Sequence, residues 1–159
     1  MRKRIIGEVP QRETGDEHQW LPLEALAEVE VTSEDPAHPI ESALMPGGGS
    51  LGWRAATSGE QTLRLRFDTP QHISRIRLVF EETEARRMQE FVLCWSPAGE
   101  LGAREIVRQQ YNFSPPETTT EVEEYNVQLS GVATLELIIV PDVQRGNAPA
   151  RLKELRLAP

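Results

Sequence analysis

The feature that most constrains the fold is a series of short segments in which apolar and polar residues alternate. In the segment 61–67 (QTLRLRF), the leucines and the phenylalanine fall on one side of an extended chain and the two arginines fall on the other. Further segments that favour strands, separated by turn-forming residues, are 24–31, 72–80, 91–95, 104–113, 118–129, 132–140 and 151–157. This pattern predicts an all-β sandwich or barrel of about eight strands.

The interruptions between these segments are rich in residues that favour turns. Pro70 interrupts one pair of neighbouring segments, and Ser130 with Gly131 interrupts another, so each pair is expected to form two separate strands. Residues 32–50 contain several prolines and three consecutive glycines, and we interpret them as a long loop. Within this loop, residues 40–44 have the composition of a single helical turn.

Length and composition fit one domain with a polar lead-in. A chain of 159 residues buries roughly 70% of the surface that its unfolded form exposes, so it needs no metal or disulfide to fold. Residues 1–23 are polar without a sustained period and predict an extended or partly ordered arm. Residues 24–159 are expected to form the β-sandwich domain. Its first strand is expected at 24–31, with a short helix there as the alternative.

The charge of the chain argues against a general binder of nucleic acid. The net charge is −8, whereas proteins that bind phosphate backbones usually carry a basic stripe. No apolar run reaches the roughly 7 to 15 residues of a signal-peptide core or the roughly 20 of a membrane helix. We therefore expect a cytoplasmic protein with neither a nucleic-acid nor a membrane partner. The single cysteine, Cys94, lies in an apolar run and is interpreted as a buried side chain.

Catalytic chemistry leaves no recognisable pattern in the sequence. His18, His38 and His72 are far apart and do not have the spacing of metal ligands. No nucleophile elbow of the form GxSxG occurs. Pairs of carboxylates could be assembled in the acidic runs 81–84 and 121–124, but such runs are typical of solvated faces. The expectation is a protein that is not an enzyme and has no cofactor.

Residues suited to sugar binding occur in several predicted connections. Such sites need an aromatic face that stacks on C–H groups and planar polar side chains that make paired hydrogen bonds to hydroxyls. The candidate binding residues are Arg86, Arg87, Tyr111, Asn112, Phe113, Arg145 and Asn147. The alternative interpretation is that the aromatic residues close the edge of the core and the arginines pair with nearby glutamates.

Several motifs also occur in a characteristic order. They are a first strand followed by a long Pro-rich loop, Gly52-Trp53-Arg54-Ala55, the strand 61–67, a segment of the form p-x-x-I-x-x-I-x-L-x-F from Pro70 to Phe80, the strand 91–93 and the closing segment 150–157. In this order they resemble the discoidin family, the factor five/eight type C domains of the galactose-binding-like superfamily. The resemblance covers roughly residues 24–157.

This resemblance implies a jelly-roll β-sandwich of about eight mostly antiparallel strands, whose loops at one end bind a ligand that is most often a sugar. Many members also ligate a structural calcium next to an aspartate-glycine pair. The corresponding stretch here, Leu44-Met45-Pro46-Gly47, has no carboxylate. Calcium prefers about six to eight oxygen ligands, and only Glu41 and backbone carbonyls remain to supply them. We therefore expect no calcium.

Two functional hypotheses follow. The first is a non-catalytic carbohydrate-binding module, and the second is an intracellular protein-interaction or assembly domain on the same fold. The superfamily includes the amino-terminal domain of a single-strand-break repair scaffold, whose corresponding stretch resembles Trp53-Arg54-Ala55-Ala56. A sugar site should gather an exposed aromatic side chain beside Arg and Asn, whereas a docking face should show an apolar patch of roughly several hundred Å².

Overall fold

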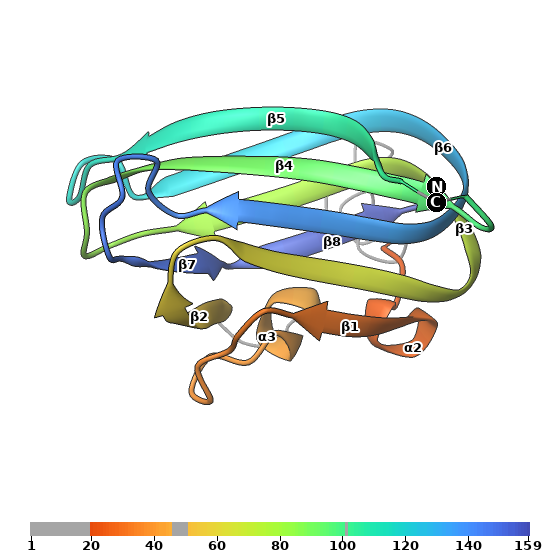
Figure 1. The fold of residues 1–159 in the computed structure, drawn as a ribbon, viewed down its shortest axis with the longest axis horizontal. Coiled ribbons are helices and arrows are strands. Elements are labelled where there is room, and N and C mark those ends of the chain that lie inside the picture. Colours follow the sequence, from red (N-terminus) through yellow and green to blue (C-terminus); the bar gives the residue numbers. More distant parts are fainter. Residues whose placement is uncertain (1–19, 46–50, 101) are drawn as a thin grey trace, which may run out of the picture.

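The computed structural model describes residues 20–45, 51–100 and 102–159, which form a β-sandwich (Figure 1). Two short helices, α2 (Leu23–Leu26) and α3 (Glu41–Leu44), lie near the start of this part of the chain. The strands, in chain order, are β1 (Ala27–Val31), β2 (Trp53–Ser58), β3 (Gln61–Glu81), β4 (Arg87–Pro97), β5 (Arg104–Phe113), β6 (Thr120–Val140), β7 (Pro149–Leu152) and β8 (Glu154–Ala158). The predicted all-β fold class is confirmed.

The sandwich is organised around β3 and β6, each of which is 21 residues long. The two strands are antiparallel along almost their whole length. Residues 61–66 pair with residues 134–139, and residues 73–81 pair with residues 120–129. Because the pairing register shifts between these two stretches, each strand bends and contributes one half to each layer of the sandwich.

The remaining strands extend the two halves of this ribbon. The first half of β3 also pairs with β1, the second half of β6 pairs with β4, and β4 pairs with β5, so these strands form one layer. The second half of β3 also pairs with β8, which completes the other layer. β2 and β7 form a separate two-stranded sheet beside them. All of these pairs are antiparallel, as the predicted jelly roll requires.

The expectation of two strands on either side of Pro70, and of two more on either side of Ser130 and Gly131, is wrong. Pro70 lies where the register shifts between Arg66 and Gln71, so its missing N–H group breaks no ladder hydrogen bond. Gly131 has a φ of +69°, a conformation that glycine adopts without steric cost. Both positions therefore bend a continuous strand instead of ending one.

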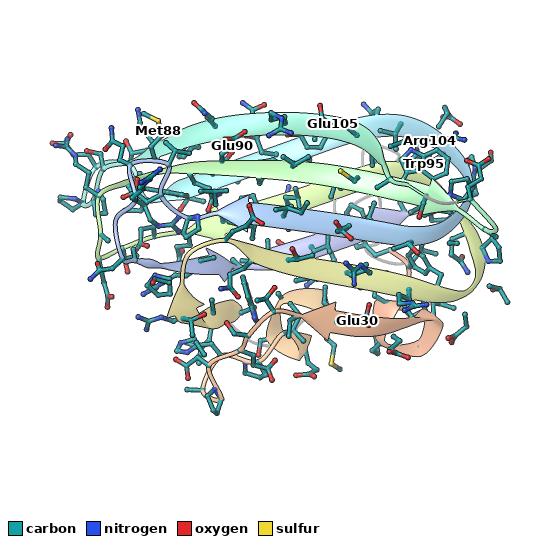
Figure 2. All side chains as sticks on the ribbon, in the orientation of Figure 1. Glu30, Met88, Glu90, Trp95, Arg104 and Glu105 are labelled. Carbon is teal, nitrogen blue, oxygen red and sulfur yellow. The ribbon has the colours of Figure 1, made fainter. Side chains whose placement is uncertain are left out.

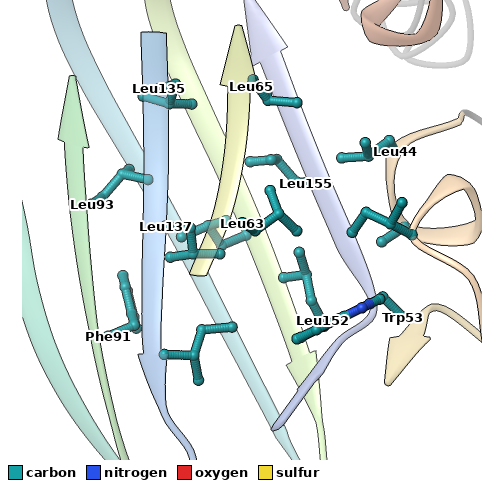
Figure 3. Close-up of a cluster of buried hydrophobic side chains, with 14 of the residues drawn as sticks. Leu44, Trp53, Leu63, Leu65, Phe91, Leu93, Leu135, Leu137, Leu152 and Leu155 are labelled. Atoms are coloured by element: carbon teal, nitrogen blue, oxygen red, sulfur yellow. The ribbon is translucent and has the colours of Figure 1, made fainter. Parts of the chain in front are cut away.

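The core lies between the two layers. Figure 3 shows Leu63, Leu65, Phe91 and Leu93 gathered in a buried cluster with side chains from other elements. Phe80 of the second layer meets Phe91 of the first with ring centroids 5.1 Å apart, which joins the layers directly. The alternation in the segment 61–67 thus identifies its inner face correctly, whereas at the start of β6 Val122 is 50% exposed and its neighbour Glu121 is buried.

The segment that enters the sandwich packs closely against it. Leu23 is fully buried, and the N–H group of Leu21 donates a hydrogen bond of 2.7 Å to the carbonyl of Leu157. The range 24–31 divides into the end of α2 and the strand β1, so both of the alternatives considered for it occur. The helical turn predicted at 40–44 is present as α3. Residues 1–19 of the expected arm and the glycines at 47–49 lie outside the described residues.

Three connections lie together at one end of the sandwich, on the left of Figure 1. They join β3 to β4 (residues 82–86), β5 to β6 (114–119) and β6 to β7 (141–148). We call this region the loop end. In the described ranges, no helix has the length and apolar character needed to cross a membrane.

Candidate functional site

A pocket of about 430 Å³ lies at the loop end, and we call it the loop pocket. Figure 2 shows one of its lining residues, Met88, at the loop end of the sheet, while Trp95 and Arg104 lie at the opposite end. The residues lining the pocket are Arg86, Arg87, Met88, Asn112, Phe113, Ser114, Thr118 and Gln144. The base of the pocket is regular sheet, because Arg87 and Met88 of β4 pair with Phe113 and Asn112 of β5.

The rim of the loop pocket is polar and open to solvent. Arg86 is exposed, and its Nη2 donates a hydrogen bond of 2.8 Å to the Oγ of Ser114. Asn112 and Gln144 are also exposed. The rim therefore offers a guanidinium group, two side-chain amides and hydroxyl groups, and the amides and hydroxyls can both donate and accept hydrogen bonds.

Under this rim lies Arg87, whose side chain is fully buried. Its Nε donates to Glu82 Oε1 at 2.7 Å, and its Nη1 donates to Gln89 Oε1 at 3.0 Å and to the carbonyl of Pro141 at 2.9 Å. The guanidinium also lies 4.7 Å from the centre of the Phe113 ring. Burial lowers the pKa of Arg87, and the carboxylate of Glu82 opposes that effect. Its Nη2 is buried without a hydrogen-bond partner in the described part of the chain.

The partner of Arg87 is held as a carboxylate. Burial raises the pKa of Glu82, but hydrogen bonds from Arg87 and from the N–H groups of Glu84 and Ala85 more than offset this, so its pKa lies below the ordinary value. The result is a buried ion pair that ties the connection 82–86 to the start of β4.

A second buried carboxyl group continues this network. Gln89 Nε2 donates to Glu121 Oε1 at 3.2 Å, and Glu121 is only 1% exposed. Burial, together with the neighbouring Glu123, raises the pKa of Glu121 to about 9, so Glu121 is protonated near neutral pH. Burial also raises the pKa of Tyr125 to about 12. Within the described ranges, Glu121 Oε2 and the Tyr125 hydroxyl have no hydrogen-bond partner.

The interpretation of the acidic runs as solvated faces is therefore wrong for Glu82 and Glu121. Glu121 occupies an inward-facing position of β6 and Glu82 lies buried in the connection 82–86, and Gln89 and Arg87 of β4 satisfy part of their hydrogen bonding. A run of charges specifies composition only, whereas the pleat of the strand decides which of its members face inward.

A second pocket, of about 410 Å³, also borders the loop end, and we call it the side pocket. It is lined by Asp35, Pro36, Arg54, Ala55, Ala56, Thr57, Ser58, Asn147 and Pro149. The connection 141–148 contributes Gln144 to the loop pocket and Asn147 to the side pocket. This connection is anchored at Asp142, whose Oδ1 accepts the N–H of Gln144 at 3.0 Å, and at Val143, whose N–H donates to the Met88 carbonyl at 2.9 Å.

The residues predicted from the sequence fall into different places. Arg86, Arg87, Asn112 and Phe113 line the loop pocket. Asn147 lines the side pocket instead.

Two predicted residues line neither pocket. Tyr111 packs edge-on against Phe113, with ring centroids 5.1 Å apart, and its hydroxyl donates to the Thr120 carbonyl at 2.8 Å. Arg145 is exposed in the connection 141–148, with a φ of +64°. Tyr111 and Phe113 thus close the edge of the core, and Arg87 pairs with Glu82, as the alternative interpretation has it.

Sequence reasoning missed Met88, Ser114, Thr118 and Gln144, which complete the loop pocket, and the whole side pocket. The composition of the connections 114–119 and 141–148 carried a weak signal, because turn-forming residues directly follow the strand ends at 113 and 140, namely Ser114 and Pro141. No cluster of three or more His, Cys, Asp or Glu side chains that could hold a metal ion occurs in residues 20–45, 51–100 and 102–159.

No protein-family model and no curated protein matches the chain. Several solved structures share its fold. The family 32 carbohydrate-binding module of NanJ from C. perfringens, in complex with galactose, matches with a TM-score of 0.64 at 14% identity, covering 87% of this chain and 97% of that one. A pectin-binding carbohydrate-binding module matches with a TM-score of 0.59 at 19% identity, covering 83% and 89%.

A protein from outside carbohydrate binding is also similar. Reduced XRCC1, in a structure where it is bound to the DNA pol beta catalytic domain, matches with a TM-score of 0.58 at 17% identity, covering 84% of this chain and 97% of that one. At such identities a structural likeness establishes the fold and leaves the ligand open. The chain therefore has the galactose-binding-like, discoidin-type fold that the family 32 carbohydrate-binding modules share.

Proposed function

We propose that this protein is a non-catalytic binding module that takes a saccharide in the loop pocket. The observation that carries the proposal is the lining of that pocket, in which amide, hydroxyl and guanidinium groups surround an opening of about 430 Å³. This volume lies within the range of about 300 to 1,000 Å³ that is usual for small-molecule sites.

The chemistry of the rim suits a polyhydroxylated ring. Each amide of Asn112 and Gln144 can donate to one sugar hydroxyl and accept from its neighbour, and the guanidinium of Arg86 can donate to two acceptors at once. Met88 and Phe113 supply apolar surface for the C–H groups of the ring. Because Met88 and Asn112 are register partners in paired strands, the site is held rigidly before the ligand arrives, which lowers the entropy lost on binding.

The solved structures support the same function. Two similar structures are a carbohydrate-binding module in complex with galactose and a pectin-binding carbohydrate-binding module. Modules of this kind bind and do not catalyse, which agrees with the lack of a catalytic motif in the sequence. The cytoplasmic location and the lack of a nucleic-acid partner, both expected from the sequence, stay predictions.

The proposal is tested by screening the purified protein on an array of neutral and acidic glycans and measuring the affinity of any hit by calorimetry. Asn112→Ala and Gln144→Ala should each abolish binding, because they remove rim amides without touching the core. The matched control is Gln128→Ala, an exposed amide on β6 far along the strand from the pocket. Melting temperatures should match in all variants, and silence across the array would overturn the proposal.

The second candidate function is protein docking, which the likeness to XRCC1 bound to a polymerase domain favours. A docking face should show a contiguous apolar patch of roughly several hundred Å². In the described ranges, the exposed large apolar side chains are Met45, Leu51 and Val122. Because these side chains supply little area, the polar pocket is the better supported site. If no glycan on the array bound and a specific protein partner were found, protein docking would become the better supported function.

A further inference from the structure

The arginines of this protein are mostly balanced by glutamates. Arg64 pairs with Glu30 and Glu136, at 3.1 and 2.8 Å, and Arg77 pairs with Glu124 at 2.6 Å. The same holds for Arg66, Arg87, Arg104, Arg108, Arg151 and Arg156. Acidic residues outnumber basic ones, 25 to 17, so a carboxylate is usually at hand. An arginine without one is therefore informative.

Three arginines in the described ranges, Arg54, Arg86 and Arg145, have no carboxylate within 4 Å, and all three border the loop end. Arg86 lines the loop pocket and Arg54 lines the side pocket. Arg145 lies in the connection 141–148 that contributes to both pockets. The side-chain partner of Arg86 is the neutral hydroxyl of Ser114, at 2.8 Å. Unbalanced positive charge thus occurs in the loop pocket, in the side pocket and in the connection that contributes to both.

The buried Arg87 adds a second, independent observation. Arg87 lines the loop pocket, its side chain is fully buried, and its Nη2 lacks a hydrogen-bond partner. An arginine nitrogen without an acceptor is unfavourable in such surroundings, because its hydration has been lost and nothing replaces it. A small shift of the rim that admits a ligand oxygen would satisfy this donor. Arg86 and Arg87 both line this pocket.

Most carboxylates of the loop end already have partners. Glu84 pairs with Arg151 at 3.1 Å, and Glu82 pairs with Arg87. Asp142 Oδ1 accepts backbone N–H groups, that of Gln144 at 3.0 Å among them. Glu117, exposed in the connection 114–119, is a counter-charge near the rim. In the side pocket, Asp35 lies close enough to Arg54 to feel its charge and also pairs with His38, at 3.4 Å.

We infer that the saccharide is an acidic oligosaccharide, whose carboxylate or sulfate groups are bound by Arg86 and Arg145, with Arg87 beneath and Arg54 in the side pocket. This inference rests on the proposed function and adds the charge of the ligand to it. Guanidinium groups bind carboxylate and sulfate oxygens through paired hydrogen bonds between opposite charges, whereas a neutral sugar offers only uncharged oxygens. The connection 141–148 borders both pockets, which suits a ligand longer than one sugar.

The test is a calorimetric titration with matched probes. Oligogalacturonate is compared with its methyl ester, which keeps the sugar ring and removes the charge, and with a sulfated and a neutral galactan oligosaccharide. We expect an acidic oligosaccharide to bind at least about tenfold more tightly than its uncharged counterpart. Whether the carboxylated or the sulfated probe binds identifies the acidic group.

Variants locate the effect. Arg86→Gln and Arg145→Gln should each weaken binding of the acidic probe by about fivefold to tenfold and weaken binding of the uncharged probe by much less. Glu117→Gln should strengthen binding of the acidic probe, because the substitution removes a negative charge near the rim. The control is Arg66→Gln, on β3 near the opposite end of the sandwich. It should leave the affinities for the acidic and the uncharged probe unchanged. Equal affinity for charged and uncharged probes would overturn the inference and leave the proposed function intact. No binding to any of the four probes would also overturn the inference, whereas the proposed function falls only with silence across the glycan array.

Discussion

Two sets of arginines in this protein lie in opposite surroundings. On the outer face of β3, Arg64 pairs with Glu30 and Glu136 while 39% of its side chain remains exposed. At the start of β4, Arg87 pairs with Glu82 at 2.7 Å, and neither side chain is more than 1% exposed. The first arrangement balances charge across neighbouring strands in water, whereas the second holds an ion pair inside the protein, directly beneath the loop pocket.

The difference shows what each arrangement contributes. An exposed pair is screened by water, so it adds little stability and tolerates change. A buried pair loses the hydration of both ions and persists only where further hydrogen bonds compensate. Arg87 has such bonds to Gln89 and to the Pro141 carbonyl. The bond to Glu82 and the bond to Pro141 connect β4 to the connections 82–86 and 141–148, so the buried pair fixes the shape of the site, and the surface pairs do not.

The largest effect is expected when the buried pair is broken. Arg87→Met preserves much of the side-chain volume but leaves the Glu82 carboxylate buried without its cation. We expect the free energy of unfolding to fall by about 3–5 kcal/mol, measured by urea denaturation. A loss below about 1 kcal/mol would show that Glu82 reaches water and that the pair is not buried in solution.

A smaller effect with a defined pH dependence is expected at Glu121. Its pKa is raised from 4.5 to about 9, so between these values the folded protein keeps a proton that the unfolded chain releases. Stability should therefore fall as the pH rises through that window. Glu121→Gln removes the titrating group and should raise the free energy of unfolding at pH 8 by about 1–3 kcal/mol.

The measurement is urea denaturation from pH 5 to pH 8.5. The matched control is Glu124→Gln on the same strand, whose side chain is 53% exposed and pairs with Arg77, and which should keep the slope of the wild-type protein. Identical slopes for the wild-type protein and Glu121→Gln would mean that Glu121 is ionised in the folded state.

The smallest effect is expected on the outer face of β3. Arg64→Met removes pairs with Glu30 and Glu136 that water already screens, so we expect a loss of about 0.2–1 kcal/mol. The loss should shrink when unfolding is repeated at 1 M salt, because exposed charges are then screened almost completely. If Arg64→Met cost as much as Arg87→Met, the contrast between the two sets of arginines would disappear.

Part of the candidate site could be predicted from the sequence. The residues that were missed share one reason, which is that strand pairing brings them to the site. Arg86, Asn112 and Phe113 stand next to strand ends, where local pattern and turn chemistry already indicate a connection. Gln144 and Thr118 join them only because β4 pairs with both β5 and β6, which brings together segments far apart in the chain. No local period contains that information.

By itself the sequence determined the all-β class of the sandwich and the apolar inner face of segments such as 61–67. Period-two alternation is a local property, because it depends only on residues that are close in sequence, as in the segment 61–67. Only the tertiary structure decided that β3 and β6 run unbroken through their bends, that Glu82 and Glu121 are buried, and that unpaired arginines meet at one end. Bending, burial and charge pairing all depend on neighbours distant in sequence, because the free energy of a charge or of a missing N–H group is set by whatever lies against it in space.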